Sequence, residues 1–483
     1  MSAGLFLTAF LVYIAALIAL SVRLSRRQAS GEDFLLGDRR VPLFLMLGTT
    51  VATMVGTGSS MGAIGKGYSD GWAGSLYGIG GAAGILLLAA LFGHVRRYNF
   101  MTFAEEIAFY YGANKTLKSL IALIMVLASA GWLGAHILGG GMYLAWVVGI
   151  DLLYAKIIVA LGFGVYVVIG GYMAVVWTDT LQAVVLFVGF LLIAGMAVAG
   201  TGGFSGVVDF AQPEQFAFLR GGQLLPSASL AFAIFVGVMA TPAFRQRIYS
   251  SDSEQTVKRS FYLSGLLYLL FSFIPAIIGM AAFQLDPGLE NANFAFPFVA
   301  SEVLPAGLGL AVLIAGLSAT LSSASSDVIA AVSILLRDVW ILFAGRMPAR
   351  EKAVAASRWG VAGITGLALL FTLAATGIID YIQYMISLVL SGLFVCAMMG
   401  RYWKRATWQG GIAALAGGAL CAIVVLNVPA WIAFWGNPSI PAVICAALAG
   451  VLGSYLSPPN AVPPAEALDI LARERAEMEM RGE

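Results

Sequence analysis

Hydrophobic runs of membrane-spanning length recur through most of this chain, and they constrain its fold more than any other feature. A helix of roughly twenty apolar residues crosses the hydrocarbon core of a bilayer and satisfies its own backbone polar groups there. The composition agrees, with 60% hydrophobic and 11% charged residues and a mean hydropathy of +0.90. We therefore expect an all-α integral membrane protein in a lipid bilayer, with about thirteen transmembrane helices by the length rule. These predicted helices lie near 4–22, 42–66, 75–95, 117–148, 153–174, 178–200, 227–245, 258–283, 306–336, 353–374, 381–400, 408–428 and 439–456.

The positions of Lys and Arg predict the orientation of these helices. If successive loops alternate between the two sides of the membrane, all basic residues except Lys66, Lys156 and Arg220 fall on one side. Basic residues are enriched in cytoplasmic loops, so the N-terminus is predicted outside and the C-terminus inside. The first run lacks a basic leader and is followed by Arg23, which predicts an uncleaved anchor and not a signal peptide. We expect a plasma membrane, and in particular a bacterial inner membrane.

Two of the runs contain residues that interrupt helices. The run at 42–66 belongs to a stretch with five glycines between positions 56 and 67, and the run at 227–245 contains Gly237 and Pro242. Such residues free backbone carbonyls, which are tolerated at membrane depth where the chain lines a cavity. The two runs are an odd number of helices apart and therefore point in opposite directions, which is the pattern of inverted repeats. Tight helix packing would explain the glycines of either run alone, but not their matched positions.

The matched breaks predict how the chain is organised. We expect two inverted repeats of five helices each, with the first helix and the last two helices at the periphery. The predicted segments are 1–41 with the first helix and a cytoplasmic loop, 42–200 as the first repeat, 201–226 as an external loop, 227–400 as the second repeat, 401–456 with two peripheral helices and 457–483 as a cytoplasmic tail.

A ladder of polar residues lies inside the apolar run at 306–336. On a helix, Ala319 and three serines of the ladder share one face. Hydroxyl groups at bilayer depth need partners, and several on one face can replace the water shell of a small hard cation such as sodium. The alternative is that the serines permit close helix packing or bond to their own backbone. The ladder consists of Ser322, Ser323, Ser325, Ser326 and Asp327.

Three motifs resemble a known family. Residues 170–182 read GGYMAVVWTDTLQ, the polar ladder is followed by Asp338, and the broken run at 227–245 is followed by Gln246 and Arg247. Together they resemble the sodium:solute symporters, and short pieces such as 55–58 are similar to the choline, proline and pantothenate carriers of that family. The resemblance implies inverted repeats of the leucine-transporter type. It also implies a carrier that couples inward sodium movement to the uptake of a small organic solute.

The resemblance also implies which atoms bind sodium. The central site would use the backbone carbonyls of Ala52, Val55 and Ala319 and the hydroxyls of Ser322 and Ser323. A second site, present in some members, would use Asp179, Ser325 and Ser326 with Ser322. One or two sodium ions per solute therefore both remain open. Asp179 could also cap a helix, alone or in addition to binding an ion.

The solute is less well defined by the sequence. Asp327 departs from the family pattern, and its roles as a partner of His136, a partner of a substrate amine or a proton carrier all stay open. The positions where family members bind sugars carry Ser59 and Gly78 here, and no arginine lies in the run at 117–148, where a sialic-acid carboxylate would bind. This leaves a small amino acid, organic amine or organic acid. The expected solute-binding residues are Gly56, Ser59, Ser60, Tyr77, Trp132, His136, Thr241, Tyr384 and Ser387.

Other classes of protein fit the sequence less well. The chain has only two histidines and no nucleophile motif, which argues against an enzyme. A proton-coupled carrier with Asp179, Asp327 and His136 as relays is the nearest alternative, followed by a transporter-like sensor. Interrupted helices around a midplane site favour alternating access over a channel. Neither a nucleic acid nor an obligate protein partner is expected, and the cofactor is the sodium ion.

Overall fold

The regular structure of the chain is helical throughout the part that the structure describes. The computed structural model describes residues 3–25, 36–208, 224–345 and 350–480, in which every regular element is a helix and the only bridge joins Val41 to Ser251. The principal helices are α1 (Ala3–Ser25), α3 (Leu43–Met54), α4 (Ala63–Asp70), α5 (Leu76–Phe92), α6 (Phe103–Tyr110), α7 (Lys115–Val148), α8 (Leu152–Gly200), α10 (Leu224–Ala240), α11 (Pro242–Ser250), α12 (Glu254–Phe271), α13 (Phe273–Leu285), α15 (Ala306–Ile334), α17 (Arg350–Thr372), α18 (Ile378–Met385), α19 (Ser391–Tyr402), α20 (Trp408–Leu426), α22 (Ser439–Tyr455) and α23 (Pro464–Met480).

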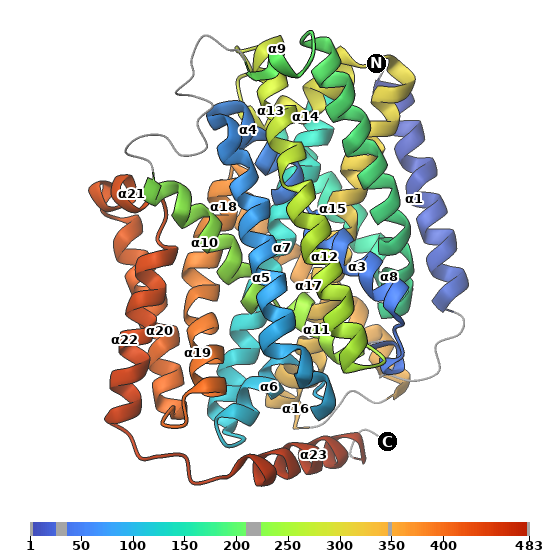
Figure 1. Cartoon of the computed structure of the whole chain (residues 1–483). Helices are drawn as coiled ribbons and strands as arrows, with labels where there is room; N and C mark the ends of the chain where they lie inside the picture. Colours follow the sequence, from blue (N-terminus) through green and yellow to red (C-terminus); the bar gives the residue numbers. More distant parts are fainter. Residues whose placement is uncertain (1–2, 26–35, 209–223, 346–349, 481–483) are drawn as a thin grey trace.

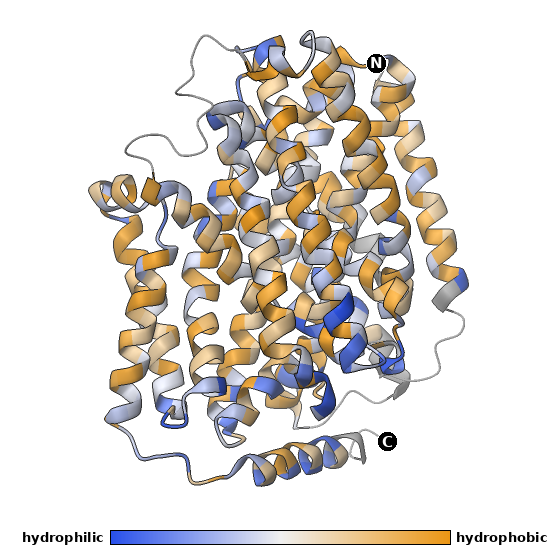
Figure 2. Ribbon diagram, viewed as in Figure 1, coloured by the Kyte–Doolittle hydropathy of each residue, from blue (hydrophilic) through white to orange (hydrophobic). Residues whose placement is uncertain are grey.

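Most of these helices stand side by side in one bundle (Figure 1). The helix α1 lies at one edge, α20 and α22 lie at the opposite edge, and α23 crosses one end of the bundle (Figure 1). Figure 2 shows hydrophobic residues along most of the upright helices, with hydrophilic residues concentrated near their ends and on α23. This distribution is the one expected for helices that cross a bilayer.

The number of membrane spans in the described residues is lower by a strict criterion than the sequence predicts. Seven described helices are long and apolar enough to cross a membrane, or nine if each of two bent pairs forms one span. The helix α3 and the segment Leu152–Gly162 are apolar but shorter. The helix α15 has 29 residues but is not among these seven. The count of about thirteen therefore stays a prediction.

The helices break where glycine and proline interrupt the runs. The helix α3 ends at Met54, and the chain continues as a π-helical turn at Gly58–Gly62 before α4 begins. The pair α10 and α11 bends by 42° at Thr241, which precedes Pro242. The predicted separation between 153–174 and 178–200 lies at Gly171 instead, where φ is 61° and ψ is −179° inside α8. The left-handed φ explains why a glycine occupies this position.

The central helix of the bundle is α15. It packs mainly on α8 and α7 and also contacts α3 and α11. Its residues from Leu317 to Ile334 are all buried, including every member of the polar ladder. The ladder therefore faces protein and not lipid, which is the arrangement that polar groups need at this depth.

Close packing of α4 against α13 leads to a stability prediction. A Cβ atom at Gly279 would overlap the carbonyl oxygen of Ile64, and one at Gly67 would lie 2.9 Å from the Cα of Ala276. We expect Gly279→Ala to lower the melting temperature in detergent, with a cost of about 1–3 kcal/mol from overpacking. The matched control is Gly195→Ala in α8, where no atom lies within 4 Å of the added Cβ. An equal effect of both substitutions would contradict this packing.

Candidate functional site

Four oxygen atoms expected to bind sodium lie together where α3 ends against α15. Ser322 Oγ is 3.0 Å from the carbonyl oxygen of Ala52 and 3.2 Å from that of Ala319. Ser323 Oγ is 3.4 Å from the Ala52 carbonyl oxygen and 3.1 Å from that of Thr53. The carbonyls of Ala52 and Thr53 belong to the last turn of α3, where no helical N–H follows to bond them. The break in the helix thus supplies acceptors that the serines reach from α15.

The fifth expected ligand belongs to the residue that terminates α3. Val55 follows Met54 with φ −87° and ψ 59°, so its backbone has left the helical conformation. The next residue, Gly56, lies against α15, since a Cβ there would be 2.6 Å from Ser323 Oγ and 3.1 Å from His136 Cε1. Only a glycine permits this close approach of the broken helix to the serines.

The oxygens expected at the second cation site also lie together, around Asp179. Its carboxylate accepts hydrogen bonds from Thr49 Oγ1 at 2.7 Å, Ser326 Oγ at 3.0 Å and Ser325 Oγ at 3.5 Å. Asp179 is fully buried inside α8, so it does not cap a helix. The guanidinium of Arg247 lies 3.4 Å from the same carboxylate. We call Asp179, Thr49, Ser325 and Ser326 the Asp179 cluster.

A cavity adjoins the central oxygens. Ser323 belongs both to the central oxygen set and to the wall of this central cavity. Five expected solute-binding residues line it, namely Gly56, Tyr77, Trp132, His136 and Thr241. The remaining lining residues are Thr53, Met54, Gly58, Ile234, Val238, Phe244, Tyr268, Ser323 and Asp327.

An acid–base pair forms the most polar part of the central cavity. His136 Nε2 lies 3.2 Å from Asp327 Oδ2, and His136 Nδ1 lies 2.9 Å from Thr57 Oγ1. Both side chains of the pair are 5% exposed. The indole N–H of Trp132 is buried in the same region without an acceptor. The cavity thus offers a paired charge, one free donor and aromatic walls.

The other four expected solute-binding residues are not among the residues that line the central cavity. Ser59 Oγ bonds to the Met54 carbonyl at 2.9 Å and Ser60 Oγ to the Gly56 carbonyl at 2.8 Å, so both satisfy carbonyls freed by the helix break. Ser387 Oγ bonds to the Gln383 carbonyl and to Ser439, and Tyr384 is 39% exposed. Whether such a side chain faces the cavity depends on how its helix is rotated, and residue type alone does not predict this rotation.

Several residues at these sites were not assigned by sequence reasoning. Thr49 and Thr53, one turn apart on α3, donate their hydroxyls to Asp179 and to Ser326, respectively. Arg247 entered only as part of a motif, although its guanidinium lies among these oxygens. The two threonines are four residues apart and therefore on one face of an apolar helix, and this spacing could have indicated a polar site there.

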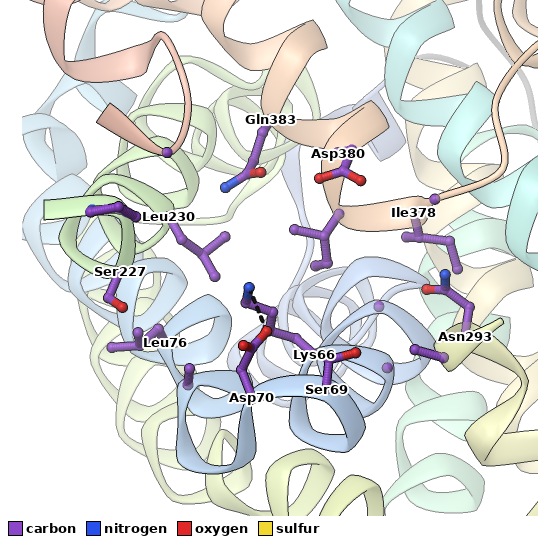
Figure 3. A pocket seen from close by; sticks show the side chains of 18 residues that line it. Lys66, Ser69, Asp70, Leu76, Ser227, Leu230, Asn293, Ile378, Asp380 and Gln383 are labelled. Atoms are coloured by element: carbon purple, nitrogen blue, oxygen red, sulfur yellow. Dashed lines mark ion pairs between the residues drawn. The ribbon is translucent and has the colours of Figure 1, made fainter. Parts of the chain in front are cut away.

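A second, more polar cavity lies beyond the central one, and we call it the Lys66 cavity. Lys66 and Asp70 project from α4 and form an ion pair of 2.8 Å. Figure 3 shows this pair facing Asp380 and Gln383 of α18 across the cavity. The ion pair and the amide give this cavity a hydrophilic wall, in contrast to the aromatic wall of the central cavity.

Isoleucines of α18 separate the two cavities. Gly58 lines the central cavity and Gly62, one turn further along the chain, lines the Lys66 cavity. A Cβ at Gly58 would lie 2.7 Å from Ile382 Cδ1, and one at Gly62 would lie 2.9 Å from Ile379 Cδ1. The isoleucines therefore pack directly on the glycine backbone between the two cavities.

Broken helices around a buried oxygen set are the architecture of secondary transporters. The sequence profile of the sodium:solute symporter family matches residues 34–418, and the chain belongs to this family. The sodium/glucose cotransporter of Vibrio parahaemolyticus is 26% identical over 456 residues, which cover 83% of this chain and 81% of the relative. The sodium/pantothenate symporter of Escherichia coli (strain K12) is 23% identical over 476 residues, which cover 94% and 97%.

Solved structures share the fold. A sodium-coupled sialic acid symporter in a substrate-bound, outward-open state superposes with a TM-score of 0.77 at 21% identity, covering 94% of this chain and 98% of that chain. Mhp1, a nucleobase-cation-symport-1 family transporter, gives a TM-score of 0.62 at 14% identity, covering 93% and 99%. The predicted family, the all-α fold and the prediction of a carrier instead of an enzyme are confirmed. The helix count and the orientation in the membrane remain predictions.

Proposed function

We propose that this protein couples inward sodium movement to the uptake of a small organic solute across the plasma membrane by alternating access. The observation that carries the proposal is the convergence of Ala52, Ala319, Ser322 and Ser323 oxygens where α3 ends. These ligands are neutral hard oxygens, which suit a monovalent cation and leave it free to dissociate. With the N-terminus outside and the C-terminus inside, the basic ends of the helices face the cytoplasm.

One residue contributes both to the sodium site and to the solute cavity, which gives a physical basis for coupling the two binding events. Ser323 belongs to the central oxygen set and also lines the central cavity. A sodium ion that orders Ser323 and the end of α3 would therefore preform one wall of the solute site. Because such coupling is reciprocal, bound solute would raise the affinity for sodium by the same factor. The Lys66 cavity would then be the entrance from outside, with Ile379 and Ile382 as the barrier.

The central cavity supports a solute that has both an apolar part and a polar group. Tyr77, Trp132 and Tyr268 offer ring surfaces, and the indole N–H of Trp132 lacks an acceptor. The pair of His136 and Asp327 would bind an ionised group of the solute by exchanging partners with it. A small amino acid, organic amine or organic acid fits this lining.

Transport by purified protein in liposomes tests the proposal. Solutes from a panel of these classes are offered with an inward gradient of sodium, lithium, potassium or protons. We expect at least one solute to accumulate with sodium and not with a proton gradient alone. Accumulation driven by protons without sodium would instead favour the second candidate, a proton-coupled carrier, for which the buried pair of His136 and Asp327 is the specific observation.

A substitution at Asp327 should separate solute binding from sodium binding. We expect Asp327→Asn to weaken solute binding at least tenfold, because a hydrogen bond to a charged group contributes about 1.5–3 kcal/mol. Sodium affinity measured without solute should stay within about threefold, since the described hydrogen bond of Asp327 goes to His136 and not to a central oxygen, and such a change is under 1 kcal/mol. Asp380→Asn in the Lys66 cavity is the control, with near-normal solute affinity. Unchanged solute affinity in Asp327→Asn would exclude this role.

A further inference from the structure

A lysine near the start of α8 is buried, although lysine side chains are mostly exposed in proteins. Lys156 is 3% exposed, and it lines neither the central cavity nor the Lys66 cavity. Gly141 of α7 leaves space for it, because a Cβ there would lie 3.0 Å from Lys156 Cγ. A buried ammonium needs partners for its hydrogens, since an unpaired buried charge is strongly unfavourable. The partners of Lys156 therefore indicate what its charge does.

The ammonium binds the loop between α17 and α18. Lys156 Nζ lies 2.7 Å from the carbonyl oxygen of Thr372 and 2.8 Å from that of Ala375. The carbonyl oxygen of Leu373 lies 3.5 Å from the same nitrogen, so each of the three ammonium hydrogens has an acceptor. Thr372 is the last residue of α17, where the helix dipole also favours a positive charge. Lys156 thus holds the end of α17 and the following loop in one conformation.

This loop leads directly into the barrier between the two cavities. The helix α18 begins at Ile378, three residues after Ala375. In its first turns, Ile379 and Ile382 pack on the glycines that line the Lys66 cavity and the central cavity. A solute that passes from one cavity to the other must displace these side chains. The loop held by Lys156 is therefore the segment about which α18 can turn.

Two other attachments near this end of α18 are weaker. Tyr381 Oη donates to the carbonyl oxygen of Gly131 in α7 at 3.0 Å. Asn291 Nδ2 donates to the carbonyl oxygen of Thr376 at 3.0 Å. Each is one hydrogen bond between neutral groups, whereas a hydrogen bond from a charged donor is about twice as strong. When α18 moves, Tyr381 can therefore release Gly131 while the loop stays on Lys156.

We propose that Lys156 is a positioning residue that fixes the hinge of α18 and thereby sets the closed position of the barrier between the Lys66 cavity and the central cavity. This inference rests on the proposed entry of the solute through the Lys66 cavity. Without the ammonium, the carbonyl oxygens of the loop lose its hydrogen bonds, and the loop would move toward other donors. The isoleucines would then spend less time on the glycines, and the central cavity would be open to the outside more often.

Thiol labelling of the full-length protein in right-side-out membrane vesicles tests the inference. The reporter is Ile234→Cys, which lies behind the barrier in the wall of the central cavity, in a background with Cys421→Ser and Cys445→Ser. A positively charged, membrane-impermeant methanethiosulfonate is added from outside. We expect Lys156→Met to speed labelling of the reporter about fivefold, because labelling follows the population of the open state. Cys396 is 0% exposed in α19 and is the internal control, whose labelling should not change.

The outcomes distinguish a hinge from a merely structural lysine. Equal acceleration at Ile234→Cys and at Cys396 would show general loosening of the protein and would overturn the inference. Unchanged labelling of the reporter in Lys156→Met would also overturn it. Lys156→Gln keeps two donors and is the milder variant, which should give a smaller increase and decides the question if Lys156→Met does not fold. Absence of sodium-driven uptake by the wild-type protein would instead refute the proposed function, and it would leave these labelling rates to decide the role of Lys156.

Acetylation of the wild-type protein tests the fixed position of the hinge without a substitution. Acetic anhydride modifies accessible lysines, and mass spectrometry measures the modification at each one. We expect Lys156 to stay unmodified both without sodium and at saturating sodium. Lys66, whose side chain is 36% exposed, should react in both conditions and serves as the positive control. Modification of Lys156 in either condition would show that the loop leaves the ammonium, which contradicts a fixed hinge.

Discussion

The double substitution Ser322→Ala and Ser323→Ala is expected to raise the sodium concentration for half-maximal uptake more than tenfold. Each hydroxyl is one of the few ligands at the central site, and each lies within 3.4 Å of the Ala52 carbonyl oxygen. The loss of one such interaction with a charged group costs about 1.5–3 kcal/mol, and about 1.4 kcal/mol corresponds to a tenfold change in affinity. Uptake of the solute at a series of sodium concentrations in liposomes measures the effect.

The control for this experiment comes from the same helix. Ser318 Oγ lies 2.6 Å from Tyr13 Oη and bonds to the Ile314 carbonyl, so it serves the contact of α15 with α1. Ser318→Ala should leave the sodium dependence near that of the wild type. A double mutant of Ser322 and Ser323 with normal uptake at low sodium would remove the central site from the proposal.

The substitution Arg245→Ala is expected to destabilise the protein by about 3–5 kcal/mol, because it leaves a buried carboxylate without its partner. Arg245 Nη1 lies 2.9 Å from Glu106 Oε1, and the two side chains are 1% and 0% exposed. Tyr110 and Tyr249 donate to the same carboxylate at 2.8 and 2.5 Å, and Phe92 covers the guanidinium at 3.8 Å. The pair joins α6 to α11, so its loss should also loosen the broken span. Thermal unfolding in detergent measures the change.

An exposed ion pair provides the control. Arg97 pairs with Glu254 at 3.1 Å, but these side chains are 58% and 31% exposed. Arg97→Ala should change stability by at most about 1 kcal/mol, since exposed pairs contribute little. Replacing Arg245 by Met together with Glu106 by Leu should recover much of the loss, because no charge is then left buried. Equal effects of Arg245→Ala and Arg97→Ala would show that burial does not determine how much an ion pair contributes to stability.

The sequence by itself determined the features of this protein that are local along the chain. The predicted run at 117–148 is the helix Lys115–Val148, and the run at 306–336 contains the helix Ala306–Ile334. Such agreement is expected because hydrophobicity and backbone hydrogen bonding act over adjacent turns. The positions of the breaks at 56–62 and at Pro242 follow from glycine and proline for the same reason. The motifs then identified the family, which the profile match confirms.

Only the tertiary structure decided which polar groups meet. His136 of α7 reaches Asp327 of α15, and Arg247 of α11 reaches Asp179 of α8, across many intervening residues. These pairings depend on how each helix is rotated and how closely it approaches its neighbours, and residue type does not encode either quantity locally. Ser59 is an example. It was expected to bind the solute, but its hydroxyl bonds to the carbonyl of Met54, which the break in the helix leaves free. Sequence defined where the helices break and which groups are available there, whereas packing decided which of those groups face a cavity, an ion or one another.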